Sequence, residues 1–181
     1  MGLKKWQLLS SKVAFQNRWW LVHQERCQLP SGLIINDYFV RVAQPIVMIL
    51  ALTSEKEVVL VRQYRHGIRN ILTELPAGSV EEGEDIRAAA RRELKEETGF
   101  ETEELIEIGR LANDPAGSNN YKHVFLALNA KASTHQTPDA TEEIEVLTVP
   151  LPRFREMLRD GEICCSGCVA AGFLGLAHLD Q

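Results

Sequence analysis

The chain has 181 residues, of which 45% are hydrophobic, and its formal net charge is -5. This length suits one domain, or one domain with a substantial extension, and the apolar content is sufficient for a core. The mildly negative net charge argues against a protein that binds a nucleic-acid backbone, which requires a basic surface. A bound divalent cation can reverse the local electric field, so a small anionic substrate stays possible.

The N-terminal residues and the cysteines indicate a soluble, reduced, cytoplasmic protein. "MGLKKWQLLSSK" has no apolar segment of signal-peptide length, and no run approaches the length of a membrane span, so no membrane partner is expected. Four cysteines are too few for a disulfide framework. "CCSGC" slightly resembles a metal knuckle, but no second cysteine or histidine pair follows it, which favours small reduced thiols.

The first half of the chain is typical of strands. "RWWLVHQERCQL" and "LIINDYFVRV" flank the turn signal "PSG", so residues 4–42 are expected to form a hairpin sheet. "PIVMILAL" (45–52) is a continuous apolar run that suits a strand buried on both faces. Residues 57–65 predict another strand, and 70–78 predict a strand end followed by a loop.

Helical spacing begins near Glu84. Ile86, Ala90 and Leu94 recur every four residues, and Gly99 stands where a C-terminal cap belongs. The remaining pattern predicts strands at 105–113, 121–130 and 144–151, a polar loop at 137–143, and helices at 152–161 and about 167–178. Strands and helices mix without regular alternation, which predicts a mixed-sheet α/β or α+β domain.

The helix carries a group of acidic residues. Glu93 and Glu97 are four residues apart and share a face, Glu96 lies beside them, and Arg92 is placed to hold the Glu96 carboxylate. Three close carboxylates repel one another unless something compensates, and a hard divalent cation bound through oxygen is the natural compensation.

The glycines before the helix support this metal hypothesis. Gly78 lets backbone approach closely, so the carbonyl of Ala77 becomes a candidate metal ligand, and Gly83 lets the loop turn into the helix. On composition alone, a helix rich in Glu, Arg and Lys is usually an exposed, salt-bridged face, which is the alternative interpretation. Beside the metal hypothesis, Glu81, Glu82 and Asp85 are expected to be solvated charges.

The spacing of the whole stretch resembles the Nudix box. The matching positions are Gly78, Glu84, Arg92, Glu93, Leu94, Glu96, Glu97, Gly99 and Phe100. The wider resemblance runs from about residue 45 to the end of the chain. It implies an α/β/α sandwich with a mixed β-sheet, and a hydrolase that uses Mg²⁺ or Mn²⁺ to cleave a nucleoside diphosphate linked to another moiety.

The resemblance also implies roles for single residues. Glu93 and Glu97 match the main metal-binding glutamates, Glu96 matches a further ligand or a residue that orients the water, and the Ala77 carbonyl matches a backbone ligand. Arg92 matches the residue that orients the glutamates, and Glu84 matches a structural residue near the start of the helix.

A narrower resemblance points to the subgroup of ADP-ribose pyrophosphatases. Pro115, 16 residues after Gly99, matches that subgroup, as does "VVLVRQYRHGIRNILTELPAG". Residues 1–44 resemble its N-terminal β extension, which implies a homodimer, with the hydrolase domain at 45–181. The subgroup often continues after its proline with Gly and an acidic residue, whereas this chain has Asn119 and Asn120, which leaves room for other nucleotide sugars such as GDP-mannose.

A later loop supplies further candidates for catalysis. By the resemblance, Glu142 aligns best with a glutamate that acts at the metals as ligand or general base, and Glu143 is the close alternative. General-base catalysis requires that one of them lie within hydrogen-bond reach of the attacking water. A solvated loop glutamate is an equally good interpretation of each residue taken alone.

Several residues could contact the substrate. The guanidinium of Arg65 suits a phosphate, while Arg62, three positions earlier on the expected strand, would point to the opposite face. Trp20 and Tyr38 could stack on a base, although packing within a dimer is the alternative for the tryptophans. Two other functions stay open: a Nudix hydrolase of nucleoside triphosphates or dinucleoside polyphosphates, and a non-catalytic sensor of a nucleotide sugar.

Overall fold

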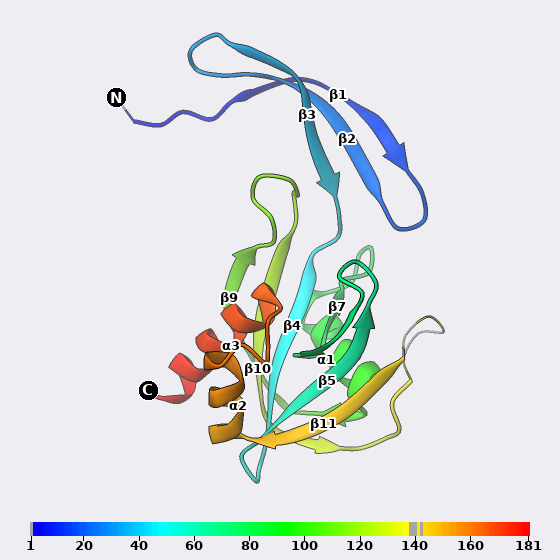
Figure 1. Ribbon diagram of the computed structural model, residues 1–181, viewed down its shortest axis with the longest axis vertical. Coiled ribbons are helices and arrows are strands. Elements are labelled where there is room, and N and C mark those ends of the chain that lie inside the picture. Colours follow the sequence, from blue (N-terminus) through cyan, green and yellow to red (C-terminus); the bar gives the residue numbers. More distant parts are fainter. Residues whose placement is uncertain (1, 138–140, 142) are drawn as a thin grey trace. The chain divides into compact units, whose positions relative to one another are not determined.

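A computed structural model describes residues 2–137, 141 and 143–181, and the chain forms two compact units (Figure 1). One unit contains Met1–Gln44 together with Ala112–Tyr121, and the other contains Pro45–Leu111 together with Lys122–Gln181. The segment at 112–121 therefore belongs with the N-terminal residues rather than with the strands that it connects.

The first unit is built on a three-stranded antiparallel sheet in the order β1-β2-β3, with β1 Gln7–Gln16, β2 Leu21–Gln28 and β3 Ile34–Val42. The turn expected at "PSG" lies between β2 and β3, and Gly32 has a φ of 89° there, which favours glycine. Arg41 at the end of β3 hydrogen-bonds through its backbone to Gly117 and Asn119, which joins the 112–121 segment to this sheet.

The second unit contains an eight-stranded mixed sheet. Its main path is β11-β5-β4-β10-β8, with β6 paired to β5, β7 to β4 and β9 to β10. The strands are β4 Ile46–Thr53, β5 Glu57–Arg65, β6 Asn70–Glu74, β7 Ala77–Ser79, β8 Phe100–Glu101, β9 Glu104–Ala112, β10 Tyr121–Ala132 and β11 Ile144–Pro150. β4 pairs parallel with β10 and antiparallel with β5 and β7.

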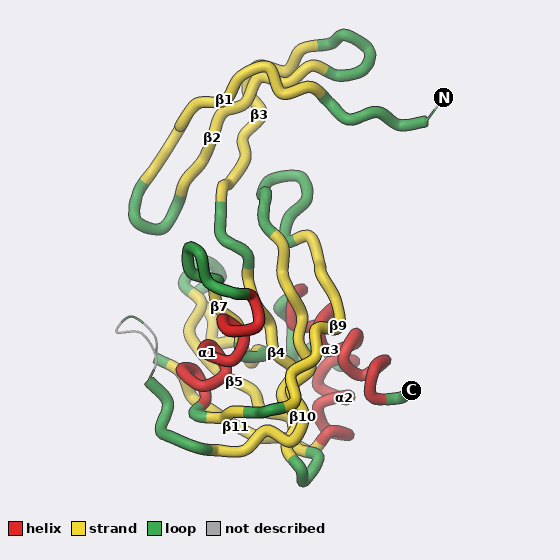
Figure 2. The backbone as a smooth tube through the Cα atoms, turned by 180° about the vertical axis from the view of Figure 1, so that it is seen from behind, coloured by secondary structure: helices red, strands yellow, loops and turns green. Residues whose placement is uncertain are grey.

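Helices cover both faces of this sheet (Figures 1 and 2). The helices are α1 Ile86–Thr98, α2 Leu151–Arg159 and α3 Ser166–Leu179. Alternate residues of β4 belong to two separate cores: Val47 and Ile49 pack with α1 residues, while Met48 and Leu50 pack with residues of α2 and α3. The predicted α/β/α sandwich and the strand buried on both faces are therefore confirmed.

The element boundaries differ from the predictions in three places. Residues 70–78 form β6 and most of β7 rather than one strand end and a loop, and the short β8 was not predicted. Helix α1 begins at Ile86 rather than at Glu84 because Asp85 is its N-cap and accepts hydrogen bonds from the backbone N–H groups of Arg87 and Ala88. Asp85 is exposed, as expected of a solvated charge, and it also serves as this N-cap.

Gly99 ends α1 as the sequence predicts. It has a φ of 73°, and its N–H donates to the Lys95 carbonyl at 2.8 Å. A Cβ at this position would collide with the Thr134 carbonyl oxygen. We expect Gly99→Ala to destabilise the protein by more than about 1–2 kcal/mol, since the left-handed backbone and the collision both oppose alanine.

Chemical denaturation at constant m-value measures the effect of this substitution. Gly161→Ala is the matched control, because Gly161 has a φ of 79° but open space around its missing Cβ. An equal loss of stability in the two variants would contradict a role for the contact with Thr134.

Candidate active site

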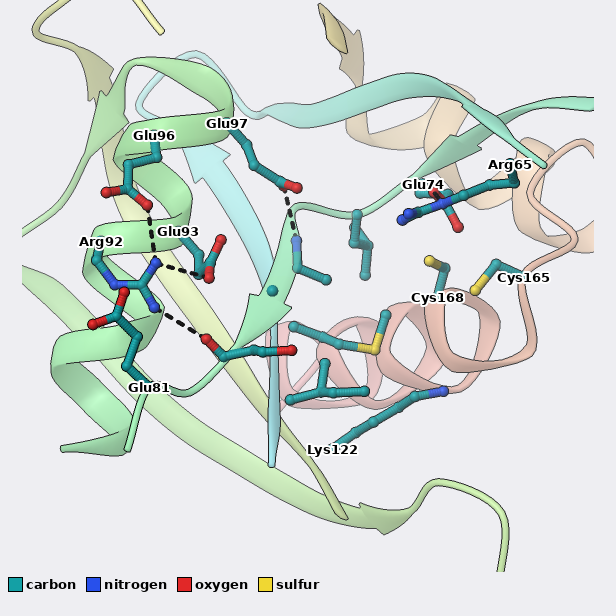
Figure 3. Close-up of a pocket in the computed structure, with 16 residues that line it drawn as sticks. Arg65, Glu74, Glu81, Arg92, Glu93, Glu96, Glu97, Lys122, Cys165 and Cys168 are labelled. Atoms are coloured by element: carbon teal, nitrogen blue, oxygen red, sulfur yellow. Dashed lines mark hydrogen bonds and ion pairs between the residues drawn. The ribbon is translucent and has the colours of Figure 1, made fainter. Parts of the chain in front are cut away.

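A cavity of about 540 Å³ opens in the second unit (Figure 3). Residues of α1 and of the loop before it line one wall: Glu81, Arg92, Glu93, Glu96 and Glu97. Residues of β5, β6, β10 and α3 line the other: Arg65, Glu74, Lys122, Cys165 and Cys168. Glu81, expected to be a solvated charge, therefore borders the cavity.

The packing of α1 sets the direction of its glutamates. Ala89, Ala90 and Leu94 are buried against the sheet, and the helical period then leaves Glu93, Glu96 and Glu97 at the edge of the buried stripe. The structure thus brings all three predicted metal-binding glutamates to one cavity wall.

Arg92 is the centre of an ionic network on this wall (Figure 3). Its guanidinium donates to the carboxylates of Glu84, Glu93 and Glu96, each at 2.9 Å, and to the Ser79 carbonyl at 3.0 Å. The pair with Glu96, expected from the spacing, is confirmed. The three carboxylates also raise the pKa of Arg92, with the hydrogen bond to Glu84 as the largest cause.

Glu97 and Glu93 are each fixed by the β7 segment. The Glu97 side chain is nearly buried, with the residue 3% exposed, and its Oε2 accepts a hydrogen bond from the Ala77 N–H at 3.0 Å. At Gly78 a Cβ would collide with the Glu93 carboxylate, so any larger residue there would displace that carboxylate from its present position. The use of the Ala77 carbonyl as a metal ligand stays a prediction.

The opposite wall carries cations as well as Glu74. Arg65 donates from Nε to Oε2 of the buried Glu74 at 2.8 Å. Arg62 pairs instead with Glu145 of β11 at 3.1 Å, which agrees with the expectation that it faces away from Arg65. Lys122, the second residue of β10, lines the cavity together with Arg65. The sequence does not predict this role, because Lys122 is an ordinary polar residue at the start of an apolar strand.

Cys165 and Cys168 form a close thiol pair at the start of α3. The hydrogen bond with the Cys168 side chain, together with the N–H groups of Cys168 and Gly167, lowers the pKa of Cys165. The hydrogen bond with Cys165, followed by burial, raises the pKa of Cys168. The two thiols therefore differ in chemistry, with the Cys165 thiol the more acidic and the Cys168 thiol the more deeply buried.

The described residues do not test the predicted loop base. Glu142 lies outside the described residues, and Glu143 is exposed directly before β11. Neither assignment is tested, and both stay predictions.

The remaining predicted substrate contacts lie in the first unit. Tyr38 donates from its hydroxyl to the Ala116 carbonyl at 2.6 Å, and the Trp20 ring carries the guanidinium of Arg41 at 4.0 Å. Pro115 lies in the turn that also contains Ala116, and it takes part in neither of these contacts. Their roles in binding a substrate stay predictions.

The charges of the cavity suit an anion together with a cation. Five glutamates and three cationic side chains (Arg65, Arg92 and Lys122) line it, which leaves a formal charge of -2 with the thiols neutral. The acidic wall offers carboxylate oxygens, the ligand type that Mg²⁺ and Mn²⁺ prefer. Arg65 and Lys122 on the other wall offer donors for phosphate oxygens.

The salt bridge between Glu84 and Arg92 predicts an acid-sensitive contribution to stability. The hydrogen bond from Arg92 lowers the pKa of Glu84 to about 2, below its value of about 4.3 in an unfolded chain. The unfolded chain thus binds the proton more readily, so this contribution is present above about pH 4.3 and is lost as the pH falls toward about 2. We expect Glu84→Gln to show a smaller loss of melting temperature than the original chain across this window.

Thermal unfolding followed between those pH values measures this difference. Glu82→Gln is the matched control, since Glu82 is exposed in the same loop. Identical pH profiles for the original chain and Glu84→Gln would contradict the assignment.

Comparisons with known proteins place these features in a family context. A family model described as "NUDIX domain" matches residues 42–162, and one described as "Nucleoside diphosphate sugar hydrolase N-terminal domain" matches residues 6–40. No helix in the described part of the chain has the length and apolar character needed to cross a membrane.

Three curated relatives are similar over most of this chain. A methanol dehydrogenase activator of Bacillus methanolicus is 29% identical, covering 90% of this chain and 88% of its own. An ADP-ribose pyrophosphatase of Bacillus subtilis is 30% identical, covering 89% and 84%. A GDP-mannose pyrophosphatase of Salmonella arizonae is 34% identical, covering 70% and 71%.

A solved structure has the same fold. The crystal structure of an ADP compounds hydrolase superposes with a TM-score of 0.86 at 23% identity, covering 99% of this chain and 97% of that one. The likeness extends over both compact units of the chain.

Proposed function

Because the chain belongs to the Nudix family of hydrolases, we propose that it cleaves the diphosphate linkage of ADP-ribose or a related nucleoside diphosphate sugar, such as GDP-mannose. The products are a nucleoside monophosphate and a sugar phosphate, which for ADP-ribose are AMP and ribose 5-phosphate. The observation that carries the proposal is one cavity with three glutamates of α1 on one wall and two cations, Arg65 and Lys122, on the other. The pyrophosphatases among its relatives support this substrate class.

The residues of the acidic wall fit Mg²⁺ or Mn²⁺. Glu93, Glu96 and Glu97 supply hard oxygen donors on one rigid helix, and the missing side chain at Gly78 leaves room for the Glu93 carboxylate. When bound, such an ion neutralises diphosphate charge and makes a nucleophilic water available near neutral pH.

The chain's own residues then position the reactants. Glu93 and Glu97 hold the cation, Glu96 binds it or orients the water, and Arg92 keeps Glu93 and Glu96 in place through its two hydrogen bonds. Arg65 and Lys122 bind phosphate oxygens and offset their negative charge. The carboxylate of Glu142, or of Glu143, accepts the proton of the attacking water as general base.

The substrate's base and sugar are chosen by other residues. Asn119 accepts a hydrogen bond from the Ala43 N–H at 3.0 Å, and the buried Asn120 donates to the Gln44 carbonyl at 2.8 Å. Both asparagines thus bind the backbone of the first unit. Their presence where the ADP-ribose subgroup often has an acidic residue supports a substrate range wider than ADP-ribose. Trp20, Tyr38 and Pro115 are the proposed contacts to the base and sugar.

The N-terminal β extension, residues 1–44, is proposed to form a homodimer, with the hydrolase domain at 45–181. The extension exposes large apolar side chains on its strands and in the segments beside them, which favours an interface: Trp6, Leu8, Val13, Phe15, Trp19, Trp20, Leu33 and Phe39. Sedimentation equilibrium tests this proposal, and a monomer at micromolar concentration contradicts it.

A substrate panel tests the function. ADP-ribose, GDP-mannose, other nucleotide sugars and dinucleoside polyphosphates are each incubated with Mg²⁺ or Mn²⁺, and phosphate is measured after coupling to a phosphatase. Nucleoside triphosphates are attacked by the phosphatase directly, so their turnover is measured without it, from the nucleoside monophosphate formed. We expect turnover of at least one nucleotide sugar, and none without a divalent cation. Binding of a nucleotide sugar without turnover, or turnover of triphosphates alone, would contradict the proposal.

A further inference from the structure

Three potential metal ligands meet at the wall of the cavity opposite the α1 glutamates. One carboxylate oxygen of Glu74 and the sulfur atoms of Cys165 and Cys168 all lie within 4.8 Å of one another (Figure 3). Glu74 and Cys168 are 5% and 1% exposed, so two of the three ligands are held in the protein interior. This is the only such set in the described part of the chain, and the carboxylates of Glu93, Glu96 and Glu97 do not form one.

The backbone around the cysteines fixes the positions of both sulfur atoms. Cys165 is the N-cap of α3, and Cys168 lies in the first turn of that helix. The spacing Cys-x-x-Cys is the one that zinc sites use most often, because it places two thiolates on the same side of a turn. Gly167 between them has no side chain, and a Cβ there would come close to the sulfur of Met48 and to Nζ of Lys122.

The third ligand comes from a different element. Glu74 is the last residue of β6, and Arg65 holds its Oε2 at 2.8 Å. Such a contact orients a carboxylate, in the way that a hydrogen-bonded partner orients a metal ligand. A cation bound here would therefore connect the end of β6 to the start of α3.

We propose that Glu74, Cys165 and Cys168 form a second metal site, separate from the α1 glutamates, for a borderline-soft divalent cation of the Zn²⁺ class. Thiolate ligands select such ions over Mg²⁺ and Mn²⁺, which prefer oxygen. Binding replaces the two thiol protons, which leave to solvent. The two thiolates, Glu74 and Arg65 together carry a formal charge of -2, which one divalent cation neutralises.

The site has three protein ligands, and all of them line the cavity. Zn²⁺ takes four ligands in a tetrahedral arrangement, so the fourth position is open to the cavity, where a water or an oxygen of a bound anion can occupy it. This inference does not rest on the proposed function, since it needs only the three side chains and their access to the cavity.

Cobalt binding tests the proposal on the full chain. Co²⁺ is added under inert gas to metal-free protein whose four cysteines are shown to be reduced by titration with a thiol reagent. We expect a near-ultraviolet thiolate-to-cobalt absorption band that saturates at one equivalent and is bleached by Zn²⁺. Cys165→Ser and Cys168→Ser should each abolish the band.

Glu74→Gln should weaken cobalt binding by more than about 10–100-fold, the range seen when a residue that only supports a ligand is lost. Cys164→Ser is the matched control: Cys164 is exposed and adjacent in sequence but outside the cluster, so this variant should keep the band. Glu97→Gln should keep it too, which separates this site from the α1 glutamates.

Four results of the cobalt titrations would overturn the proposal. They are the absence of a band in fully reduced protein, a band that survives both single cysteine substitutions, loss of the band in Cys164→Ser, and an unchanged affinity in Glu74→Gln. A pair that stays oxidised, with only two titratable thiols after reduction, would instead indicate a structural disulfide and would also overturn it. Failure of the nucleotide-sugar panel leaves each of these readouts unaffected.

Discussion

Replacing Glu97 with glutamine is expected to lower kcat for diphosphate hydrolysis by about a thousandfold or more while the protein stays folded. A metal ion contributes several kcal/mol of charge stabilisation in the transition state, and each 1.36 kcal/mol corresponds to about tenfold in rate. Glu97 is nearly buried at the cavity, so the loss of its charge is not offset by solvent. A glutamine oxygen can still accept the hydrogen bond from the Ala77 N–H, which preserves the local structure.

The experiment measures kcat, the dependence of rate on Mg²⁺ concentration, and the melting temperature. Glu82→Gln removes the same charge from an exposed position in the same sequence stretch and should have nearly the original activity. Retained turnover in Glu97→Gln would count against the metal assignment. If Glu97→Gln loses both its activity and its folded state, the metal assignment is tested instead with Glu93→Gln. We expect this variant to bind Mg²⁺ more weakly than the original chain.

Gly78→Ala is expected to reduce kcat by about a hundredfold, since a displacement of about 1 Å in a reacting group has effects of that size. The new methyl group would collide with the Glu93 carboxylate, which must then leave its contact with Arg92 at 2.9 Å. The backbone of β7 pairs with β4 on its other side, so the strand cannot easily retreat. The change adds one carbon and removes no charge.

Gly67→Ala is the matched control, because Gly67 has open space around its missing Cβ and an ordinary backbone conformation. Steady-state kinetics of both variants decide the matter. We expect the kcat of Gly67→Ala to stay close to that of the original chain. Equal activity in the two variants would show that the position of Glu93 does not limit the reaction.

The sequence predicts the acidic wall because that wall is local. Glu93, Glu96 and Glu97 lie on one helix, so their helical spacing is enough to place them on one face. The same holds for the cap at Gly99 and for the double burial of β4. The predicted start of α1 is two residues too early because Asp85 is the N-cap, a role that the apolar spacing does not reveal.

The opposite wall could not be predicted in this way, because it depends on the order of strands in the sheet. Glu74, Lys122 and Cys165 come from β6, β10 and α3, and they meet only after β10 pairs with β4 and β6 pairs with β5. The cysteine motif is incomplete in the sequence because no second cysteine or histidine pair follows it. The third potential ligand is instead a glutamate that the fold brings to the motif.

The two cores on either side of β4 have a consequence for how this enzyme can diverge. Glu97 stands on the helix that packs in one core, whereas Cys168 is itself part of the other core. Distant residues without shared partners contribute almost additively to stability. Natural variation can therefore remodel the layer that holds Cys168 with little effect on the stability of the layer that holds α1 and the glutamates proposed to bind the metal.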